Sequence, residues 1–254
     1  MSKQWQQDQS FDRIAKKFEK NIYGTTKGRL RHELLLHYLQ QHLPAGPLDC
    51  LDAGGGTGVM AKALAEMGHK VLVNDISADA LDLARAKFEG EIQVNFHCGP
   101  LQSLDSHNQF DLITCHAVLE WLSDPYEALN ALFDRLKPGG YLSLSFFNLD
   151  AHRFSNLLYG NFDYVDKEFV VSNRVRLNPN KALAPAEVID FLKAEDFAIR
   201  HQAGIRCFHD YMRDKSMQNS HYEQIKAKEI QFGTTHPYLW LGRYFHLLAV
   251  KPES

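Results

Sequence analysis

A run of glycines between an apolar segment and an amphipathic one constrains this chain most. The segment "LDCLDAGGGTG" covers residues 48–58, and "VMAKALAEMG" follows over residues 59–68. The apolar residues before the glycines predict a buried strand, and the apolar spacing after them predicts a helix. A turn this tight needs backbone angles that glycine adopts without strain, and the missing side chains let a ligand approach the main chain. Strand, glycine loop and helix together predict a nucleotide-binding element.

Two kinds of ligand fit this loop. Residues 56–61 match the G-x-G-x-x-A pattern of dinucleotide-binding enzymes, and Asp75 follows at roughly the 20-residue spacing of a ribose-binding acid. Residues 52–58 equally match D-x-G-x-G-x-G, the first motif of S-adenosylmethionine (SAM) methyltransferases. The loop alone leaves both interpretations open.

The order of elements along the chain predicts an α/β fold. Strand and helix patterns alternate from residue 48 to residue 148, which indicates a doubly wound, mostly parallel sheet. Residues 149–183 break the alternation, and helical spacing resumes at 185–194. Two strands, predicted at 198–208 and 238–250, then close the chain. We therefore expect seven strands with the last one antiparallel, an arrangement typical of SAM methyltransferases.

The predicted domains differ in charge. We expect an N-terminal helical cap over residues 1–46 and a methyltransferase domain over residues 47–254, with an insertion at about 149–184. Residues 1–46 have a net charge of +4, residues 47–150 of −9 and the remainder of +2, which gives −3 in total. The basic segments at the two ends of the chain are compatible with a surface that binds an anionic partner. Solvated helix faces explain the same charges equally well.

Targeting signals and cysteine spacing indicate the cellular compartment and the kinds of site to expect. The segment "MSKQWQQDQSFDRIAKKFEK" has no apolar core, and no run approaches the roughly 20 apolar residues of a membrane span. The four cysteines show no C-x-x-C spacing, so we expect reduced, buried thiols in a cytoplasmic protein, with no metal site and no membrane contact.

The segments that follow the glycine loop favour SAM. "FDLITCHAVLEWLSDP" and "LKPGGYLSLSF" resemble motif IV through strand five of class I methyltransferases. SAM carries a carboxylate, an ammonium, a ribose diol, an adenine and a sulfonium, and each predicts a partner. The expected cofactor residues are Asp52 for the loop or the ammonium, Gly54 and Gly55 for close approach of the backbone, Asp75 for the ribose, Pro100 and Leu101 for the adenine, and His116 beside the acceptor. Turn or cap roles for the two acids, and a packed strand-end role for His116, are the alternatives.

Several longer stretches resemble one methyltransferase family across nearly the whole chain. They are "NIYGTTKGRLR", "HAVLEWLSDP", "GNFDYV", "GIRCFHDYMRDK" and "LGRYFH". These stretches are similar to those of the tRNA 5-carboxymethoxyuridine methyltransferases. The resemblance implies a SAM-dependent enzyme that acts on the tRNA anticodon loop and methylates the carboxylate of 5-carboxymethoxyuridine at the wobble position. It also implies that Arg31 belongs to the cofactor site, where its fork of donors suits the SAM carboxylate.

A carboxylate acceptor sets modest chemical demands. It is already ionised at pH 7, so no general base is needed to create the nucleophile. The site needs a cation or donors for the acceptor and aromatic surfaces for a flipped-out base. We expect these from Arg206, His209 and Tyr211, with Tyr164 next, although surface charge and core aromatics explain the same residues.

Three other functions stay open at this point. They are a class I methyltransferase for a small carboxylic acid or phenol, a non-catalytic SAM-binding module, and a nicotinamide oxidoreductase.

Overall fold

A mixed sheet of seven strands forms the centre of a computed structural model that describes residues 12, 24–88, 93–105, 107–170 and 181–253. The strands are β1 (Asp49–Ala53), β2 (Lys70–Asp75), β3 (Val94–Cys98), β4 (Phe110–His116), β5 (Leu136–Phe147), β6 (Ala198–Ile205) and β7 (Tyr244–Val250). Their spatial order is β3-β2-β1-β4-β5-β7-β6. The first five strands pair in parallel, and β7 lies antiparallel between β5 and β6. The predicted fold class is confirmed.

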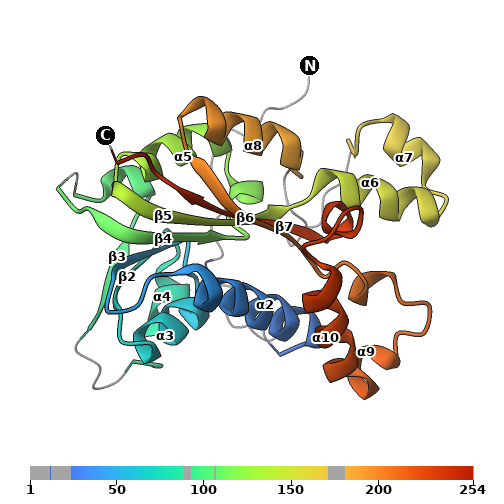
Figure 1. Ribbon diagram of the computed structural model, residues 1–254, viewed down its shortest axis with the longest axis horizontal. Helices are drawn as coiled ribbons and strands as arrows, with labels where there is room; N and C mark the ends of the chain where they lie inside the picture. Colours follow the sequence, from blue (N-terminus) through green and yellow to red (C-terminus); the bar gives the residue numbers. More distant parts are fainter. Residues whose placement is uncertain (1–11, 13–23, 89–92, 106, 171–180, 254) are drawn as a thin grey trace.

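Helices cover both faces of this sheet (Figure 1). They are α2 (Thr26–His42), α3 (Val59–Glu66), α4 (Ala78–Arg85), α5 (Pro125–Phe133), α6 (Leu149–Leu158), α7 (Phe162–Asp166), α8 (Pro185–Ala194), α9 (Met217–Ser220) and α10 (Tyr222–Phe232). The first three pack on one face and α5 and α8 on the other, so each face has its own apolar core. The sheet is therefore buried on both faces, which leaves the ends of its strands as the place for a ligand.

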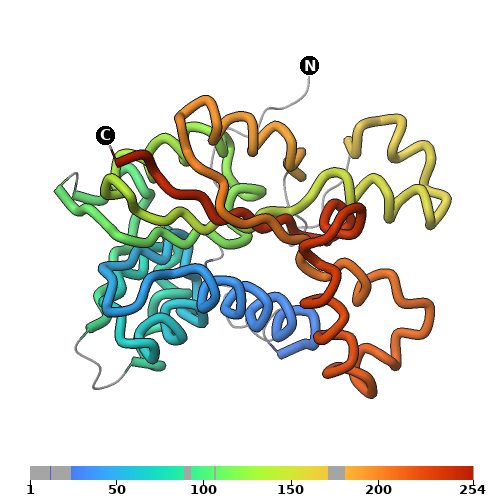
Figure 2. Tube along the Cα trace, viewed as in Figure 1, coloured from blue at the N-terminus to red at the C-terminus, as the bar shows by residue number. Residues whose placement is uncertain are grey.

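Four helices extend the fold beyond the carboxyl end of β5. Figure 2 follows the chain from β5 into α6 and α7, while α9 and α10 lie after β6 in the sequence. Asn148 begins α6, since its side chain accepts hydrogen bonds from the backbone N–H groups of Asp150 and Ala151. The predicted insertion at about 149–184 thus contains α6 and α7 among its described residues. Of the predicted N-terminal cap, the structure describes α2; residues 1–11 and 13–23 lie outside the described residues.

Two predicted boundaries differ from the structure. We predicted a last strand over residues 238–250, but β7 begins at Tyr244, because Tyr238–Leu241 form a short 3₁₀ helix. We also extended β6 to residue 208, whereas it ends at Ile205 because Arg206 has a φ of +65°.

The cysteines are free, as expected, but they are not all buried. Cys50, Cys115 and Cys207 are buried, whereas Cys98 is exposed at the end of β3, which corrects the prediction for that thiol. Within the described ranges, no group of three or more His, Cys, Asp or Glu side chains could hold a metal ion. None of the helices described combines the length and the apolar character that a membrane crossing needs.

Candidate functional site

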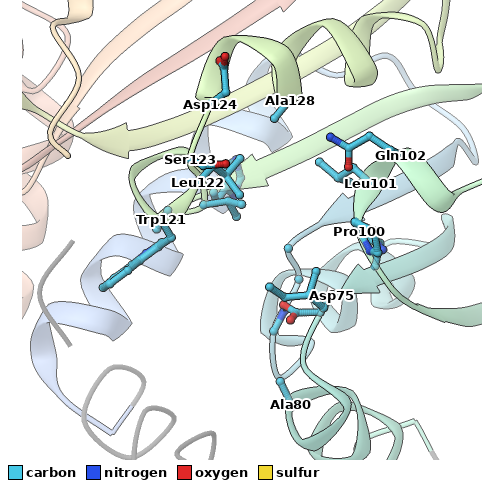
Figure 3. A pocket seen from close by; sticks show the side chains of 18 of the residues that line it. Asp75, Ala80, Pro100, Leu101, Gln102, Trp121, Leu122, Ser123, Asp124 and Ala128 are labelled. Atoms are coloured by element: carbon cyan, nitrogen blue, oxygen red, sulfur yellow. The ribbon is translucent and has the colours of Figure 1, made fainter. Parts of the chain in front are cut away.

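A pocket opens at the carboxyl ends of β1, β2 and β4, the edge where doubly wound sheets bind ligands. Seven of the predicted cofactor residues line it: Arg31, Gly54, Gly55, Asp75, Pro100, Leu101 and His116. Figure 3 shows Asp75, Pro100 and Leu101 on one wall, with Trp121 and Leu122 across the pocket from them. Residues that are far apart in the sequence thus meet around one cavity.

The glycine loop leaves room only for backbone. A Cβ on Gly54 would lie 2.5 Å from Val118 Cγ2, and Gly54 has a φ of +66°. A Cβ on Gly55 would lie 2.7 Å from Asp52 Oδ2. Both positions therefore exclude any larger residue, and the main chain itself forms this wall of the pocket.

Asp52 lies beneath the loop rather than in the pocket lining. Its Oδ1 accepts a hydrogen bond of 2.7 Å from the Thr114 hydroxyl, while Oδ2 is buried with no hydrogen-bond partner among the described residues. Burial raises the pKa of Asp52 to about 6. This position suits the first of the two predicted roles, in which Asp52 holds the loop.

Asp75 ends β2 and organises the turn that follows. Its Oδ2 accepts a hydrogen bond of 2.9 Å from the Gly56 N–H, and its Oδ1 accepts one of 2.8 Å from the Ser77 N–H. Each carboxylate oxygen keeps a second acceptor site, so Asp75 can still accept hydrogen bonds from a ligand's hydroxyl groups.

Arg31 brings a cation to the pocket from α2. Its side chain is 7% exposed, and its guanidinium carbon lies 5.1 Å from the centre of the Tyr244 ring. A guanidinium against an aromatic face is held at low entropy cost and still presents its N–H edge to an anion. His116 also lines the pocket but, unlike Arg31, carries no positive charge.

His116 is half-buried and begins a chain of polar contacts that leads across neighbouring strands to the buried Ser143 and His246. Its Nε2 lies 2.8 Å from Ser143 Oγ, which lies 3.0 Å from His246 Nε2. The hydroxyl has one proton, so at least one of the two imidazoles must donate to it. Burial lowers the pKa of His116 to about 3 and holds the pKa of His246 well below its usual value. Both rings are therefore neutral, which avoids a positive charge next to Arg31.

These neutral histidines should make stability depend on pH. Below about pH 6.5 the unfolded chain protonates His246 while the folded chain does not, so the free energy of unfolding falls as the pH drops. We expect His246→Gln to reduce this slope by an amount that grows from about 0.7 kcal/mol per pH unit at pH 6.5 to about 1.4 near pH 5. Urea unfolding at several pH values measures it, with His107→Gln, a change at an exposed position, as the control. Parallel curves for wild type and His246→Gln would contradict the expectation.

Arg206 provides a second buried cation close to the first. It is 8% exposed, its Nη2 donates to Asp210 Oδ2 at 2.8 Å, and its guanidinium carbon lies 5.4 Å from the centre of the Tyr244 ring. The Arg206 guanidinium is the main cause that lowers the pKa of Asp210 to about 2, against the opposing effect of burial. Tyr244 thus contacts both arginines.

The other three predicted acceptor residues occupy different settings. His209 is fully buried, with Nδ1 donating to Asp210 Oδ1 at 2.8 Å and Nε2 lying 3.2 Å from Thr26 Oγ1. The Tyr211 hydroxyl lies 3.0 Å from the Leu241 carbonyl oxygen and 3.3 Å from that of Ala151. Tyr164 lies on α7, in ring contact with His152 and Phe169. None of the four predicted acceptor residues, Arg206 included, lines the pocket described above.

Several residues that we did not predict also shape the site. They are Gln102, Val118, Trp121 and Leu122 in the lining, Tyr244 between the arginines, and Ser143 and His246 behind His116. Val118, Trp121 and Leu122 stand in the quoted segment "FDLITCHAVLEWLSDP", so their place in the sequence was a usable signal. Ser143 and His246 also stand in quoted segments, but nothing in the sequence indicated that they form hydrogen bonds behind His116.

Comparisons with known proteins agree with this geometry. A family model described as "Methyltransferase domain" matches residues 51–144. The tRNA 5-carboxymethoxyuridine methyltransferase of Escherichia coli (strain K12) is 42% identical over 257 residues, covering 98% of either chain. A ubiquinone biosynthesis O-methyltransferase of Shewanella pealeana is 28% identical and covers 68% of this chain and 73% of its own.

Solved structures with the same fold have much lower identity. The plantazolicin methyltransferase BpumL in complex with SAH matches with a TM-score of 0.60 at 19% identity, covering 94% of this chain and 90% of its own. The N-methyltransferase NodS from Bradyrhizobium japonicum, also in complex with SAH, matches with a TM-score of 0.59 at 14% identity, covering 92% and 91%. These likenesses support the fold.

Proposed function

The chain belongs to the tRNA 5-carboxymethoxyuridine methyltransferase family, and we propose that it methylates the side-chain carboxylate of 5-carboxymethoxyuridine at the wobble position of tRNA. The activity is SAM-dependent methyl transfer, and the product is a methyl ester. A tRNA substrate implies that the protein acts in the cytoplasm. The observation that carries the proposal is the placement of two buried arginines, Arg31 and Arg206, against the single ring of Tyr244.

The residues of the pocket fit SAM. The wall at Gly54 and Gly55 admits only backbone, as a ligand that approaches the main chain requires. Arg31 supplies a cation for the cofactor carboxylate, and Asp75 has free acceptor sites for the ribose hydroxyls. Pro100 and Leu101 offer apolar surface for the adenine. When bound, SAM supplies an electrophilic methyl group on a positively charged sulfonium.

The second arginine suits the acceptor. The nucleoside's carboxylate is ionised at neutral pH, so the chain needs to orient it rather than deprotonate it. Arg206 provides the N–H donors for this task, while its ion pair with Asp210 fixes the guanidinium in the site. Asp210 also offsets part of the positive charge of Arg206. The acceptor carboxylate is therefore held while its oxygen stays nucleophilic. Neutral His116 adds no competing cation.

The walls of the site limit water. Trp121 and Leu122 line the pocket opposite Pro100 and Leu101 (Figure 3), Val118 also lines it, and Trp121 is buried. Excluding water strengthens the attraction between a carboxylate and the positively charged groups around it. Catalysis then consists mainly of aligning two oppositely charged reactants. The wobble base has to leave its stack to reach such a site.

Methyl transfer into tRNA tests the proposal. The purified protein is incubated with methyl-labelled SAM and tRNA from cells that lack this activity, and the nucleosides are then analysed by mass spectrometry. We expect a methyl ester of 5-carboxymethoxyuridine that mild base removes. Equal activity on the free nucleoside, or labelling of small carboxylic acids without labelling of tRNA, would contradict it and favour a small-molecule methyltransferase.

A further inference from the structure

The turn that presents Arg206 is a strained piece of backbone. β6 ends at Ile205, and Arg206 then takes a φ of +65° while its side chain is buried. A non-glycine residue keeps this conformation only where its surroundings hold it, because the left-handed region is sterically unfavourable for a residue with a Cβ. The residues that hold this turn therefore decide where the Arg206 guanidinium lies.

Glu229 on α10 bonds directly to the turn. Its side chain is 0% exposed, and it accepts three backbone hydrogen bonds, from the N–H groups of Cys207 at 2.6 Å and of Phe208 and His209 at 2.9 Å. Oε2 takes the first and Oε1 takes the other two. Only a carboxylate presents acceptor oxygens on both sides, so neither an amide nor a shorter side chain could make all three bonds.

A second brace reaches the turn from the short helix α9. Gln218 Nε2 donates to the His209 carbonyl oxygen at 2.8 Å. Glu229 accepts from the N–H groups of residues 207–209, and Gln218 donates to the last carbonyl. The turn is therefore held by hydrogen bonds to its backbone N–H groups and to one of its carbonyl oxygens.

The braced turn continues into the side chains of the acceptor region. His209 Nδ1 donates to Asp210 Oδ1, and Arg206 Nη2 donates to Asp210 Oδ2, both at 2.8 Å. His209 Nε2 lies 3.2 Å from Thr26 Oγ1, in the first turn of α2, the helix that also carries Arg31. A continuous set of hydrogen bonds thus leads from Glu229 to the guanidinium of Arg206.

We propose that Glu229 is a positioning residue for methyl transfer: it fixes the turn at residues 206–209 and so sets the Arg206 guanidinium where the acceptor carboxylate meets it. The inference rests on the proposed function, since it assigns Arg206 to the acceptor. The inference assigns a role in the reaction to α10, although no residue of this helix lines the cofactor pocket.

The Glu229→Gln variant tests this role. In it, one N–H of the turn faces an amide NH₂ group at the 2.6 Å contact, so the turn shifts while the helix keeps its size. We expect kcat/KM for tRNA carrying 5-carboxymethoxyuridine to fall about tenfold, with the Kd for SAM unchanged. Glu223→Gln is the matched control on the same helix, because the Glu223 side chain is 65% exposed.

A double-mutant cycle separates positioning from a general structural role. If Glu229 acts through Arg206, then Glu229→Gln has little further effect in an Arg206→Lys background. Additive losses in the cycle, or a parallel loss of SAM affinity, would overturn the inference. If Glu229→Gln does not fold, Gln218→Ala weakens the same turn, and its cycle with Arg206→Lys gives the same two outcomes.

The proposed function and the inference fail differently. Failure of the wild type to methylate tRNA carrying 5-carboxymethoxyuridine would overturn both. Wild-type kcat/KM in Arg206→Lys and in Arg206→Ala would remove Arg206 from the acceptor site and overturn the inference, while the proposed function would stand. Reduced kcat/KM in those variants, with wild-type values in Glu229→Gln and Gln218→Ala, would overturn the inference alone.

Discussion

Replacing Arg206 with alanine is expected to lower kcat/KM for tRNA carrying 5-carboxymethoxyuridine by about 100-fold, with little change in the Kd for SAM. Hydrogen bonds to charged groups contribute roughly 1.5–3 kcal/mol, and about 1.4 kcal/mol corresponds to a factor of ten. Arg206 is buried and paired with Asp210, so the alanine variant removes N–H donors that are held in a fixed geometry. Single-turnover methyl transfer and equilibrium SAM binding measure the two quantities.

Two further arginine variants sharpen this experiment. Arg206→Lys keeps the positive charge and loses the planar fork, so it should fall between alanine and wild type. Arg200→Ala changes an exposed arginine at the other end of β6 and should leave kcat/KM unaltered. Unchanged kcat/KM in Arg206→Ala, with the protein folded and SAM bound, would remove Arg206 from the acceptor site.

The cofactor side of the site was predictable because parallel strands share an edge. Gly54 follows β1, Asp75 ends β2 and His116 ends β4, so the carboxyl ends of three parallel strands bring them together. The pattern that predicts each strand also predicts where it ends. Sequence spacing and fold class were therefore enough to place these residues around one pocket.

The acceptor side was less predictable because contacts distant in sequence shape it. The strand predicted from the sequence ran past Ile205 to residue 208, but Arg206 leaves β6 in a left-handed conformation. Glu229, more than twenty residues further on, bonds the turn that follows. In the sequence, Glu229 resembles any acid on a polar helix, and no local pattern distinguishes a buried acceptor of three N–H groups from a solvated one.

His209 and Tyr211 show a related limit. Both stand beside Arg206 in a stretch of polar and aromatic residues that we predicted to face the acceptor. In the structure, polar atoms of both side chains lie within hydrogen-bond distance of other parts of the chain: Asp210 and Thr26 for His209, and backbone carbonyls for Tyr211. A side chain's polarity predicts that it needs a partner, and only the fold decides whether that partner is protein or ligand.

Gly54→Ala is expected to weaken SAM binding by a factor on the order of 100. The added Cβ would lie 2.5 Å from Val118 Cγ2, and a φ of +66° strains alanine by roughly 1–2 kcal/mol. Relief of both requires the loop or Val118 to move, and both line the cofactor pocket. Isothermal titration with SAM measures the effect.

Two variants separate the steric clash from backbone strain. Gly68→Ala introduces alanine at a φ of +90° with no atom within 4 Å of its Cβ, so it should lower the melting temperature and leave the Kd for SAM unchanged. Adding Val118→Ala to Gly54→Ala removes both Cγ atoms that the new Cβ meets and should restore part of the affinity. Wild-type affinity in Gly54→Ala would show that the loop does not approach the cofactor closely. Affinity lost equally in Gly68→Ala would assign the effect to stability, because that glycine lies outside the pocket lining.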